Sequence, residues 1–485
     1  MSFNSIAFFI FLPTVVLVNF SLPQRARWIF LLLASYFFYM YWEPAYLLLI
    51  VISTLIDYSA GIMLGKAESK NTRRSLLILS IAVNLGLLFA FKYYDFFQEA
   101  VAQLLALFDY SYSPSRSSLL LPIGISFFTF QTMGYSIDVY RGTIKPEKHL
   151  GYYALYVAFF PQLVAGPIER AANLIHQFKK EHVVDYARIT EGMKLVLWGL
   201  IKKVVIADRL ALFVDHVYGD PGKFSGPPLL LATVFFAFQI YCDFSGYSDI
   251  AIGSARILGI RLMLNFRRPY HARSIRDFWQ RWHISLSTWF KDYLYIPLGG
   301  SRTQIWRWQL NLFITFLISG LWHGARWNFL AWGALHGIFI VISNLTSAVR
   351  MRFSRAAGLE RYPSVLRLMN IAITFAAVNF AWIFFRANNI NDAVHVATNL
   401  FQFTAAGSRI MSDGLILGQS AAEFKIALLA IFFLETIHFF QARMSLKEIF
   451  ARQPIYVRWS GYALAAIILL NWGIVKETPF IYFQF

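Results

Sequence analysis

Long apolar stretches recur through the first third of the chain, and they limit its fold more than any other feature. A helix needs about 20 mostly apolar residues to cross a bilayer, and each stretch approaches that length. Hydrophobic residues make up 58% of the 485 residues and charged residues only 14%, whereas a soluble domain carries roughly 25% charged residues. The sequence therefore predicts a polytopic membrane protein and excludes a secreted scaffold, a nucleic-acid-binding module and a disordered chain. The stretches lie at about residues 1–22, 28–42, 46–64, 75–92 and 119–139, and we expect the short second one to tilt into an interface.

Basic residues in this part of the chain are confined to alternate loops. They precede the second stretch and follow the third and the fifth, whereas loop 42–45 has none and loop 93–118 has only Arg116. Because Lys and Arg near membrane spans stay on the cytoplasmic side, we expect the 65–74 and 141–149 loops there and the N-terminus outside. The first stretch lacks a basic start and a cleavage site, which favours a retained span over a signal peptide. Basic cytoplasmic loops also explain the net charge of +18 better than nucleic-acid binding does.

Beyond residue 150 the apolar runs are interrupted by Pro, Gly, Asn and charged residues. Backbone at membrane depth tolerates such breaks only where protein or a water-filled cavity covers it. We therefore expect an all-α polytopic fold with about ten to twelve spans and short, broken or re-entrant helices around an enclosed polar space. No soluble domain interrupts it, so residues 1–485 form one membrane domain, with the motif-rich core at 120–345 and further membrane helices at 346–485.

The segment 256–309 combines ten basic residues, two acidic ones and many aromatic rings. Such a stretch favours the membrane–water interface, with rings at the headgroups and cations outside. An interfacial anchor does not explain His283, Ser285, Ser287 and Thr288, which cluster within six residues. A cationic platform beside a polar pocket, with Arg281 next to it, can hold phosphates or a pantetheine carrier.

The segment 310–342 is longer than one membrane crossing, and Gly320 and Gly324 favour a break or re-entrant turn beside Trp322 and His323. Ionisable groups inside a span are costly and mark candidate sites. A histidine there can accept and return a proton, which suits it to activate a hydroxyl for attack on an acyl group. The alternative is a neutral ring bonded to a backbone carbonyl. This structural role is the better interpretation for His336, the second histidine of the segment. The other polar residues of the segment are Asn311, Arg326, Asn328 and His336.

A third polar cluster interrupts the apolar run at 238–259. Asp243 and Asp249 need partners this deep in a membrane, and the arginines that follow are candidates. The two carboxylates either line a polar tunnel or pin helices together, and the second role is favoured. A Ser–His–Asp triad of Ser245, His323 and Asp249 is a weak pattern, because no G-x-S-x-G elbow is present. Cys242 is expected to be a small buried hydrophobe, and as a lone cysteine it excludes an intrachain disulfide. No metal-binding motif and no phosphate loop occurs, so no metal is expected.

Together these segments resemble the membrane-bound O-acyltransferase family, and within it the bacterial branch of alginate O-acetyltransferase membrane subunits. The similarity covers nearly the whole chain to about residue 390, and motifs of this length are specific. The last ninety residues match by hydropathy only. The motifs that carry the resemblance are LLPIGISFFTFQTMGYSIDVYRG (120–142), FFPQLVAGPIER (159–170), YCDFSGYSDIAIG (241–253), NFRRPY (265–270), FWQRWHISLSTWFKDYLYIPLGG (278–300), GLWHGARWNFLAWGALHG (320–337) and WIFFRANN (382–389).

The resemblance implies a multi-helix fold around a funnel, in the cytoplasmic (inner) membrane of a bacterium. It implies a catalytic role for the histidine of the W-H-G motif, His323, and a functional role for that of the R-W-H-x-S motif, His283. We expect a cytoplasmic thioester donor, acetyl-CoA, and no other cofactor. His323, aided by His283, would act as general base, and Arg281 is a candidate donor to the oxyanion. The remaining expected substrate-binding residues are Ser285, Trp322, Asn328, Asp243 and Ser245. The acyl group would pass to a periplasmic partner that modifies an exopolysaccharide or cell-wall glycan.

Three alternatives stay open at this point. The family also contains exporters of D-alanine from an acyl-carrier protein to teichoic acid, and the same residues fit that chemistry. A transporter or flippase for lipid-linked sugars would use the histidines as proton relays only, and it would neither hydrolyse a thioester nor transfer an acyl group. A scaffold subunit would tolerate loss of His323.

Overall fold

The computed structural model describes residues 1–115, 121–164, 166–403, 410–412, 414–474 and 480–483, and its regular structure is almost entirely helical. A short hairpin of β1 (Met411–Ser412) and β2 (Leu415–Ile416) is the exception among the described residues. The predicted all-α polytopic fold is confirmed.

The first helices match the apolar stretches read from the sequence, although residues 119–120 of the fifth stretch lie outside the described residues. One difference concerns the expected loop at 93–118. Helix α4 continues through a π-helical turn, Phe89–Tyr93, into α5, so that one long helix runs from Lys70 to Ala106. The helices of this part are α1 (Ile6–Ser21), α2 (Gln24–Met40), α3 (Leu47–Lys66), α4 (Lys70–Leu88), α5 (Tyr94–Ala106) and α6 (Ile125–Arg141).

The rest of the chain alternates long helices with short ones, as the interrupted apolar runs predicted. The short helices α7 (Leu150–Ala158), α8 (Phe160–Leu163), α9 (Ala171–Phe178), α13 (Ile275–Trp279) and α14 (Ile284–Phe290) lie near the middle of the chain. The others are α10 (Tyr186–Leu200), α11 (Asp208–Tyr218), α12 (Pro227–Ile257), α15 (Ile305–His323), α16 (Trp327–Leu345), α17 (Ser347–Ala356), α18 (Pro363–Arg386), α19 (Ile390–Asn399), α20 (Ala421–Gln441), α21 (Leu446–Ala451) and α22 (Ile455–Trp472).

Five helices of the described residues are long and apolar enough to cross a membrane: Pro44–Lys66, Lys70–Ala106, Pro227–Ile257, Trp327–Leu345 and Pro363–Arg386. This makes the chain a multi-pass membrane protein. The figure of ten to twelve spans stays a prediction.

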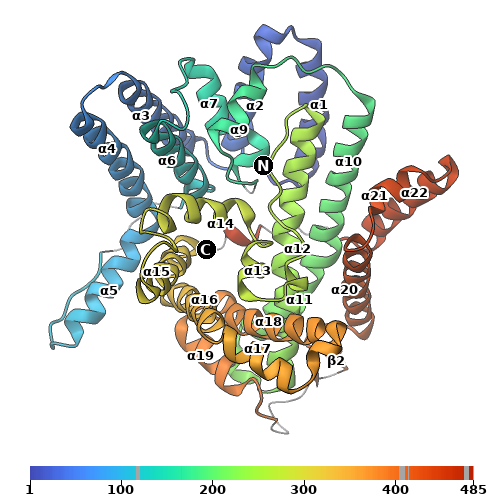
Figure 1. Ribbon diagram of the computed structural model, residues 1–485. Coiled ribbons are helices and arrows are strands. Elements are labelled where there is room, and N and C mark those ends of the chain that lie inside the picture. Colours follow the sequence, from blue (N-terminus) through green and yellow to red (C-terminus); the bar gives the residue numbers. More distant parts are fainter. Residues whose placement is uncertain (116–120, 165, 404–409, 413, 475–479, 484–485) are drawn as a thin grey trace.

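Helix α12 is the central element of the fold (Figure 1). In its most apolar stretch 83% of the residues are buried inside the protein, against 17–39% in the other four. Helix α10 packs against it through glycines, since a Cβ on Gly199 would lie 2.6 Å from the carbonyl oxygen of Gly246. Small residues of this kind let membrane helices approach closely.

The basic loops meet at one end of the bundle. Arg27 donates to the carbonyl of His182 at 2.6 Å, Tyr58 donates to the carbonyl of Lys148 at 2.6 Å, and Arg73 donates to the carbonyl of Tyr140 at 2.7 Å. These contacts agree with the confinement of basic residues to alternate loops in the sequence. That pattern predicts that these loops lie on one side of the membrane.

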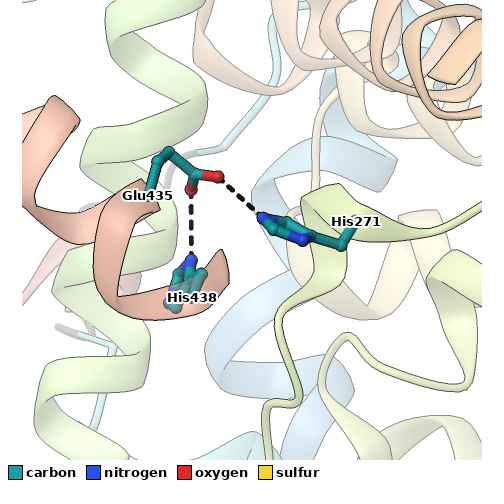
Figure 2. Close-up of side chains that lie close together, drawn as sticks. All are labelled: His271, Glu435 and His438. Atoms are coloured by element: carbon teal, nitrogen blue, oxygen red, sulfur yellow. Dashed lines mark hydrogen bonds and ion pairs between the residues drawn. The ribbon is translucent and has the colours of Figure 1, made fainter. Parts of the chain in front are cut away.

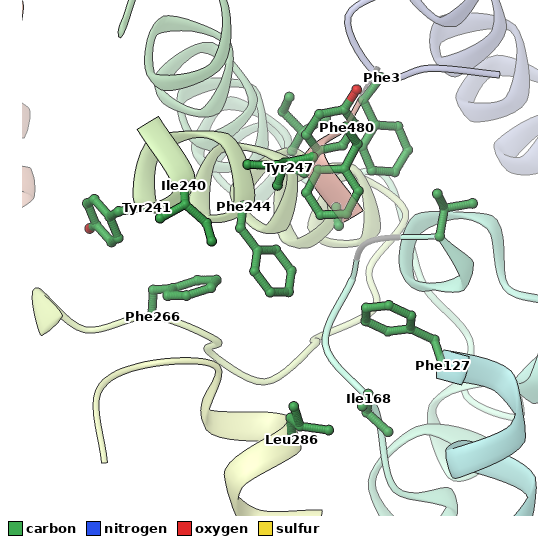
Figure 3. Packing of buried hydrophobic residues seen from close by; sticks show 14 of the residues in the cluster. Phe3, Phe127, Ile168, Ile240, Tyr241, Phe244, Tyr247, Phe266, Leu286 and Phe480 are labelled. Atoms are coloured by element: carbon green, nitrogen blue, oxygen red, sulfur yellow. The ribbon is translucent and has the colours of Figure 1, made fainter. Parts of the chain in front are cut away.

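Aromatic side chains fill the space beside α12 (Figure 3). Phe244 points from α12 toward Phe266, with 4.9 Å between ring centroids. Phe480, close to the far end of the chain, lies 4.6 Å from Tyr247 of α12. The last described segment, Phe480–Phe483, therefore returns to the centre of the molecule, where Figure 1 marks the C end of the chain.

Candidate active site

His323 is the last residue of α15, at a tight turn between two packed helices. Helix α15 ends there and α16 begins at Trp327, so the predicted break is confirmed. The two helices approach closely because glycines face each other: a Cβ on Gly320 would lie 3.0 Å from the Cα of Gly333. The turn places His323 inside the protein with 2% of its surface exposed.

Lys92 holds the end of α15 in place. It lies in the π-helical turn between α4 and α5, and its Nζ donates to the carbonyl of Trp322 at 2.7 Å and to that of His323 at 3.3 Å. The last carbonyls of a helix have no partner within the helix, and a cation satisfies them well. The neighbouring Tyr93 donates to the carbonyl of Leu321 at 3.0 Å.

His283 begins α14 in a left-handed backbone conformation, with φ 43° and ψ 55°. Such a conformation is uncommon outside glycine and persists where the surroundings enforce it. Here the neighbouring chain 265–267 enforces it: the amide of Ile284 donates to the carbonyl of Asn265, and the amide of Arg267 donates to that of Arg281, both at 2.9 Å. His283 is fully buried.

The two histidines meet, although forty residues separate them in sequence. Their ring centroids are 6.4 Å apart. Trp322 lies beside both, 6.0 Å from His283 and 4.9 Å from His323. Neither ring nitrogen of either histidine has a hydrogen-bond partner among the described residues. We call this group the histidine cage; the other rings around it are Phe127, Phe244, Trp332, Phe385 and Tyr482.

Tyr482 reaches the cage because its segment is tied to α12. Its ring lies 5.5 Å from that of His323 and 6.4 Å from that of His283. The amide of the preceding residue, Ile481, donates to Oδ2 of Asp243 at 2.7 Å, and Oδ1 of Asp243 pairs with Lys203 at 2.7 Å. Lys203 also pairs with Asp208 at 2.8 Å.

A small cavity of about 50 Å³ opens on the cage, lined among others by Lys92, Ser126, Trp322, His323 and Tyr482. One water-sized volume takes roughly 10–15 Å³ on this measure, so the cavity has room for a group of a few heavy atoms. An imidazole, two residues that carry hydroxyl groups and space for a small group therefore adjoin one another.

The other predicted site residues lie in supporting positions. Ser285 donates to Oδ1 of Asn265 at 2.9 Å and so helps to fix the start of α14. Asn328 donates to the carbonyl of Ala387 at 2.8 Å, which ties α16 to α18. The Nε of Arg281 donates to Asp277 at 2.6 Å, so a carboxylate holds the guanidinium proposed for the oxyanion. The roles predicted for these residues stay predictions.

The carboxylates of α12 have partners other than the expected arginines. Lysines that precede α12 in sequence pair with them: Lys203 with Asp243, and Lys202 with Asp249 at 2.7 Å. Lys202 also donates to Ser245 at 2.9 Å. The arginine assignment was wrong because a π-helical turn, Ile201–Ala207, directs both lysines toward α12. Ser245 and Asp249 are thus held by Lys202, and no described contact joins them to His323 as a triad would require.

Three of the five tryptophans of segment 256–309 also differ from expectation. Trp279, Trp282 and Trp289 are buried inside the protein rather than placed at the lipid headgroups. Trp282 packs 5.0 Å from Trp382 of α18. The fold buries these rings because α13 and α14 lie among α12, α15, α16 and α18 rather than on the surface (Figure 1).

His336 fits its structural interpretation, since its Nδ1 accepts a hydrogen bond from Trp279 at 3.3 Å. Cys242 is fully buried, as expected. Sequence reasoning missed Lys92, Asn265 and Tyr482. A lysine within a span was a signal for the first and the NFRRPY motif for the second. Tyr482 carried no signal, because its contacts depend on how the chain returns to the core.

The fold and the cage define a class: a multi-pass membrane protein with two neighbouring buried imidazoles, one of which, His323, lines a small cavity. Comparison with known proteins gives the family. The family model "MBOAT, membrane-bound O-acyltransferase family" matches residues 147–384. The chain is 38% identical to a probable alginate O-acetylase of Pseudomonas putida over the full length of both. The chain belongs to the membrane-bound O-acyltransferase family, and it is a membrane O-acyltransferase.

Two further relatives are named for the transfer of different acyl groups, acetyl and D-alanyl. A peptidoglycan O-acetyltransferase of Helicobacter pylori is 37% identical over 81% of this chain and 78% of its own length. A teichoic acid D-alanyltransferase of Streptococcus thermophilus is 28% identical over 57% of this chain and 70% of its own length. The higher identity to the O-acetylating relatives supports O-acetyltransferase activity.

Proposed function

We propose that the protein moves an acetyl group from a cytoplasmic thioester donor, acetyl-CoA, across the bacterial inner membrane to a periplasmic protein partner. The partner then O-acetylates an exopolysaccharide or cell-wall glycan of the alginate type. The observation that carries this proposal is the histidine cage, in which two buried imidazoles lie close together and one of them, His323, lines a cavity of acetyl size.

His323 is the general base in this proposal. It takes the proton of the accepting hydroxyl, whose oxygen attacks the thioester carbonyl. A carbon–oxygen bond forms, the carbon–sulfur bond breaks, and the thiolate leaves with the proton that His323 returns. His283, at the other side of the cage, can donate an N–H to the oxyanion that develops, in a site where such a bond is strong because water is excluded.

The basic end of the bundle supports a donor that carries phosphates. A cavity of about 840 Å³ opens there, and four of its lining residues are cations: Lys180, Arg188, Arg256 and Arg261. Burial, together with the charges of neighbouring basic side chains, lowers the pKa of His182 in the same cavity. Such a field attracts the phosphates of coenzyme A or of a phosphopantetheine carrier.

The accepting hydroxyl is expected on the partner protein, but the chain also brings one of its own to the cage. Tyr482, which carries this hydroxyl, lines the small cavity together with His323. We infer that this hydroxyl takes part in transfer, and its removal with retention of the ring tests the inference in the Discussion.

The first experiment measures glycan O-acetyl ester in cells that lack the gene. The cells are complemented with wild type, His323→Ala or His283→Ala at equal membrane abundance, with His395→Ala as a control outside the cage. We expect loss of ester with both cage variants and none with the control. Full acetylation by His323→Ala would contradict the assignment of His323 as the general base and would favour a scaffold or a transporter.

D-alanyl transfer from an acyl-carrier protein is a second candidate, favoured by the relative named a teichoic acid D-alanyltransferase. Purified protein in detergent separates the candidates. Release of free thiol from acetyl-CoA supports acetyl transfer, release from a D-alanyl carrier protein alone supports the second candidate, and release from neither points to a transporter.

A further inference from the structure

His271, Glu435 and His438 form a compact group outside the histidine cage (Figure 2). Glu435 lies between the two rings: its Oε2 is 2.8 Å from Nε2 of His271, and its Oε1 is 3.1 Å from Nδ1 of His438. One ligand atom of each residue lies within 4.8 Å of the other two. Glu435 and His438 are one turn apart on α20, whereas His271 belongs to the segment between α12 and α13.

We propose that this group is a zinc site that fastens α20 to the segment leading to His283. Two imidazole nitrogens and one carboxylate oxygen form a donor set that Zn²⁺ binds in proteins, with a fourth position open to water. In a tetrahedral site with Zn–N of about 2.0–2.1 Å, ligand atoms lie about 3.3 Å apart. Each imidazole nitrogen already lies within that separation of one oxygen of Glu435, so side-chain rotations that bring one oxygen to both nitrogens would complete the donor set.

The surroundings of His438 fit the role of a metal ligand. Its second nitrogen, Nε2, lies 3.1 Å from the hydroxyl of Tyr241. A histidine that binds a metal through one nitrogen carries its proton on the other, and a bond from that proton to an oxygen fixes the ring. Tyr241 provides such an oxygen on α12, so Nδ1 of His438, which faces Glu435, would carry the lone pair that a metal needs.

The exposure of the group allows metal and water to reach it. The side chain of His438 is 5% exposed, whereas those of His271 and Glu435 are 25% and 32% exposed. The site is therefore anchored on its inner side and open on its outer side. Binding takes place when both histidines are neutral and Glu435 is ionised, so it weakens at acidic pH.

The test uses full-length protein without a histidine tag, purified in detergent, stripped with a chelator and titrated with Zn²⁺ against a chromogenic competitor. We expect one Zn²⁺ per chain in wild type and at least 100-fold weaker binding in Glu435→Gln, which keeps the size of the side chain but removes its charge. His395→Asn is the matched control, since His395 is also partly buried but contacts an amide, Asn399; it should bind like wild type.

A second measurement, the melting temperature, distinguishes loss of zinc binding from loss of folding. Zinc that binds the native state alone raises the melting temperature as its concentration increases, and this rise should be absent in Glu435→Gln and in His271→Asn. If Glu435→Gln fails to fold, His271→Asn decides, because it alters a half-exposed side chain. Absence of Zn²⁺ binding in wild type, or equal binding in wild type and the ligand variants, overturns the proposal. These readouts are independent of acyl transfer.

Discussion

Histidines gather in two regions of this protein, and their surroundings are opposite. In the histidine cage, His283 and His323 are enclosed by aromatic rings, and no described side chain accepts or donates a hydrogen bond at their nitrogens. In the His271–Glu435–His438 group, both rings face a carboxylate, and the group is partly exposed. The same residue type is thus left available in one region and held by a charged neighbour in the other.

The contrast suits two different uses of imidazole: a reactive one in the histidine cage and an anchoring one in the His271–Glu435–His438 group. A buried polar atom without a partner is costly, and in the function proposed above a substrate provides the missing partners of the two cage rings during the reaction. A ring that already contacts a carboxylate is oriented before any ligand arrives, which suits a structural or metal-binding role. Changes in the two regions should therefore have different consequences.

The largest effect is expected from His323→Gln, compared with His336→Gln on the adjacent helix. Both residues are buried histidines among aromatic rings, but His336 already accepts a hydrogen bond from Trp279. Loss of a general base typically costs about 10²–10⁴-fold in rate, so we expect that loss for His323→Gln and less than a tenfold loss for His336→Gln. The measurement is acyl transfer by purified variants, with melting temperature as the check on folding. Equal losses would show that any change to a buried histidine in this core lowers transfer, and would contradict a special role for His323.

His283→Asn is expected to lower transfer by about 10²-fold, in keeping with loss of one donor to an oxyanion. Asparagine is chosen because it tolerates the left-handed backbone that His283 adopts, so that loss of the ring is separated from backbone strain. His283→Ala adds strain and should show the same kinetic loss with a lower melting temperature. Transfer by His283→Asn near the wild-type rate would limit this residue to shaping the turn.

Tyr482→Phe is expected to reduce transfer at least tenfold at unchanged melting temperature. The substitution keeps the ring among Phe244, Phe385 and the histidines and removes only the hydroxyl of this cavity-lining residue. Tyr482→Ala serves as comparison, because it removes both the ring and the hydroxyl and should also destabilise the cage. A Phe variant as active as wild type would assign Tyr482 a packing role.

Sequence reasoning identified the two cage histidines because each carries a local signal. His323 is an ionisable group inside an apolar run flanked by glycines, and His283 lies in a specific motif. The span at 75–92 was predicted as well, but the partner of Lys92 was not, since it touches carbonyls 230 residues away. Periodicity describes which face of a helix is apolar; it does not say which other helix meets that face.

Two further contacts escaped the sequence for geometrical reasons. The lysines that pair with α12 stand next to each other, and a regular α-helix would direct consecutive side chains about 100° apart; the π-helical turn changes this. The proposed zinc ligands come from two segments, with His271 separated from Glu435 by 164 residues, so the spacing of Glu435 and His438 on α20 could not reveal the third ligand. Both cases depend on long-range packing, which a single sequence does not encode in a readable pattern.

The smallest effect, and the one that connects the cage to the rest of the core, is expected from Asp243→Asn. This carboxylate pairs with Lys203 and accepts the amide of Ile481, so its neutralisation loosens the segment that carries Tyr482. Lys203 keeps Asp208 as a partner, which limits the cost to about 1–3 kcal/mol. We expect a severalfold loss of transfer.

Asp249→Asn is the matched control for this change. It breaks the pair with Lys202 on the same helix, but no described contact joins Asp249 to the segment Phe480–Phe483. If Asp243 acts by positioning Tyr482, Asp243→Asn lowers transfer more than Asp249→Asn at the same loss of melting temperature, and adding Asp243→Asn to Tyr482→Phe causes little further loss. Equal transfer by the two single variants would mean that Asp243 only joins neighbouring helices. The histidine cage would then hold Tyr482 through its aromatic contacts alone.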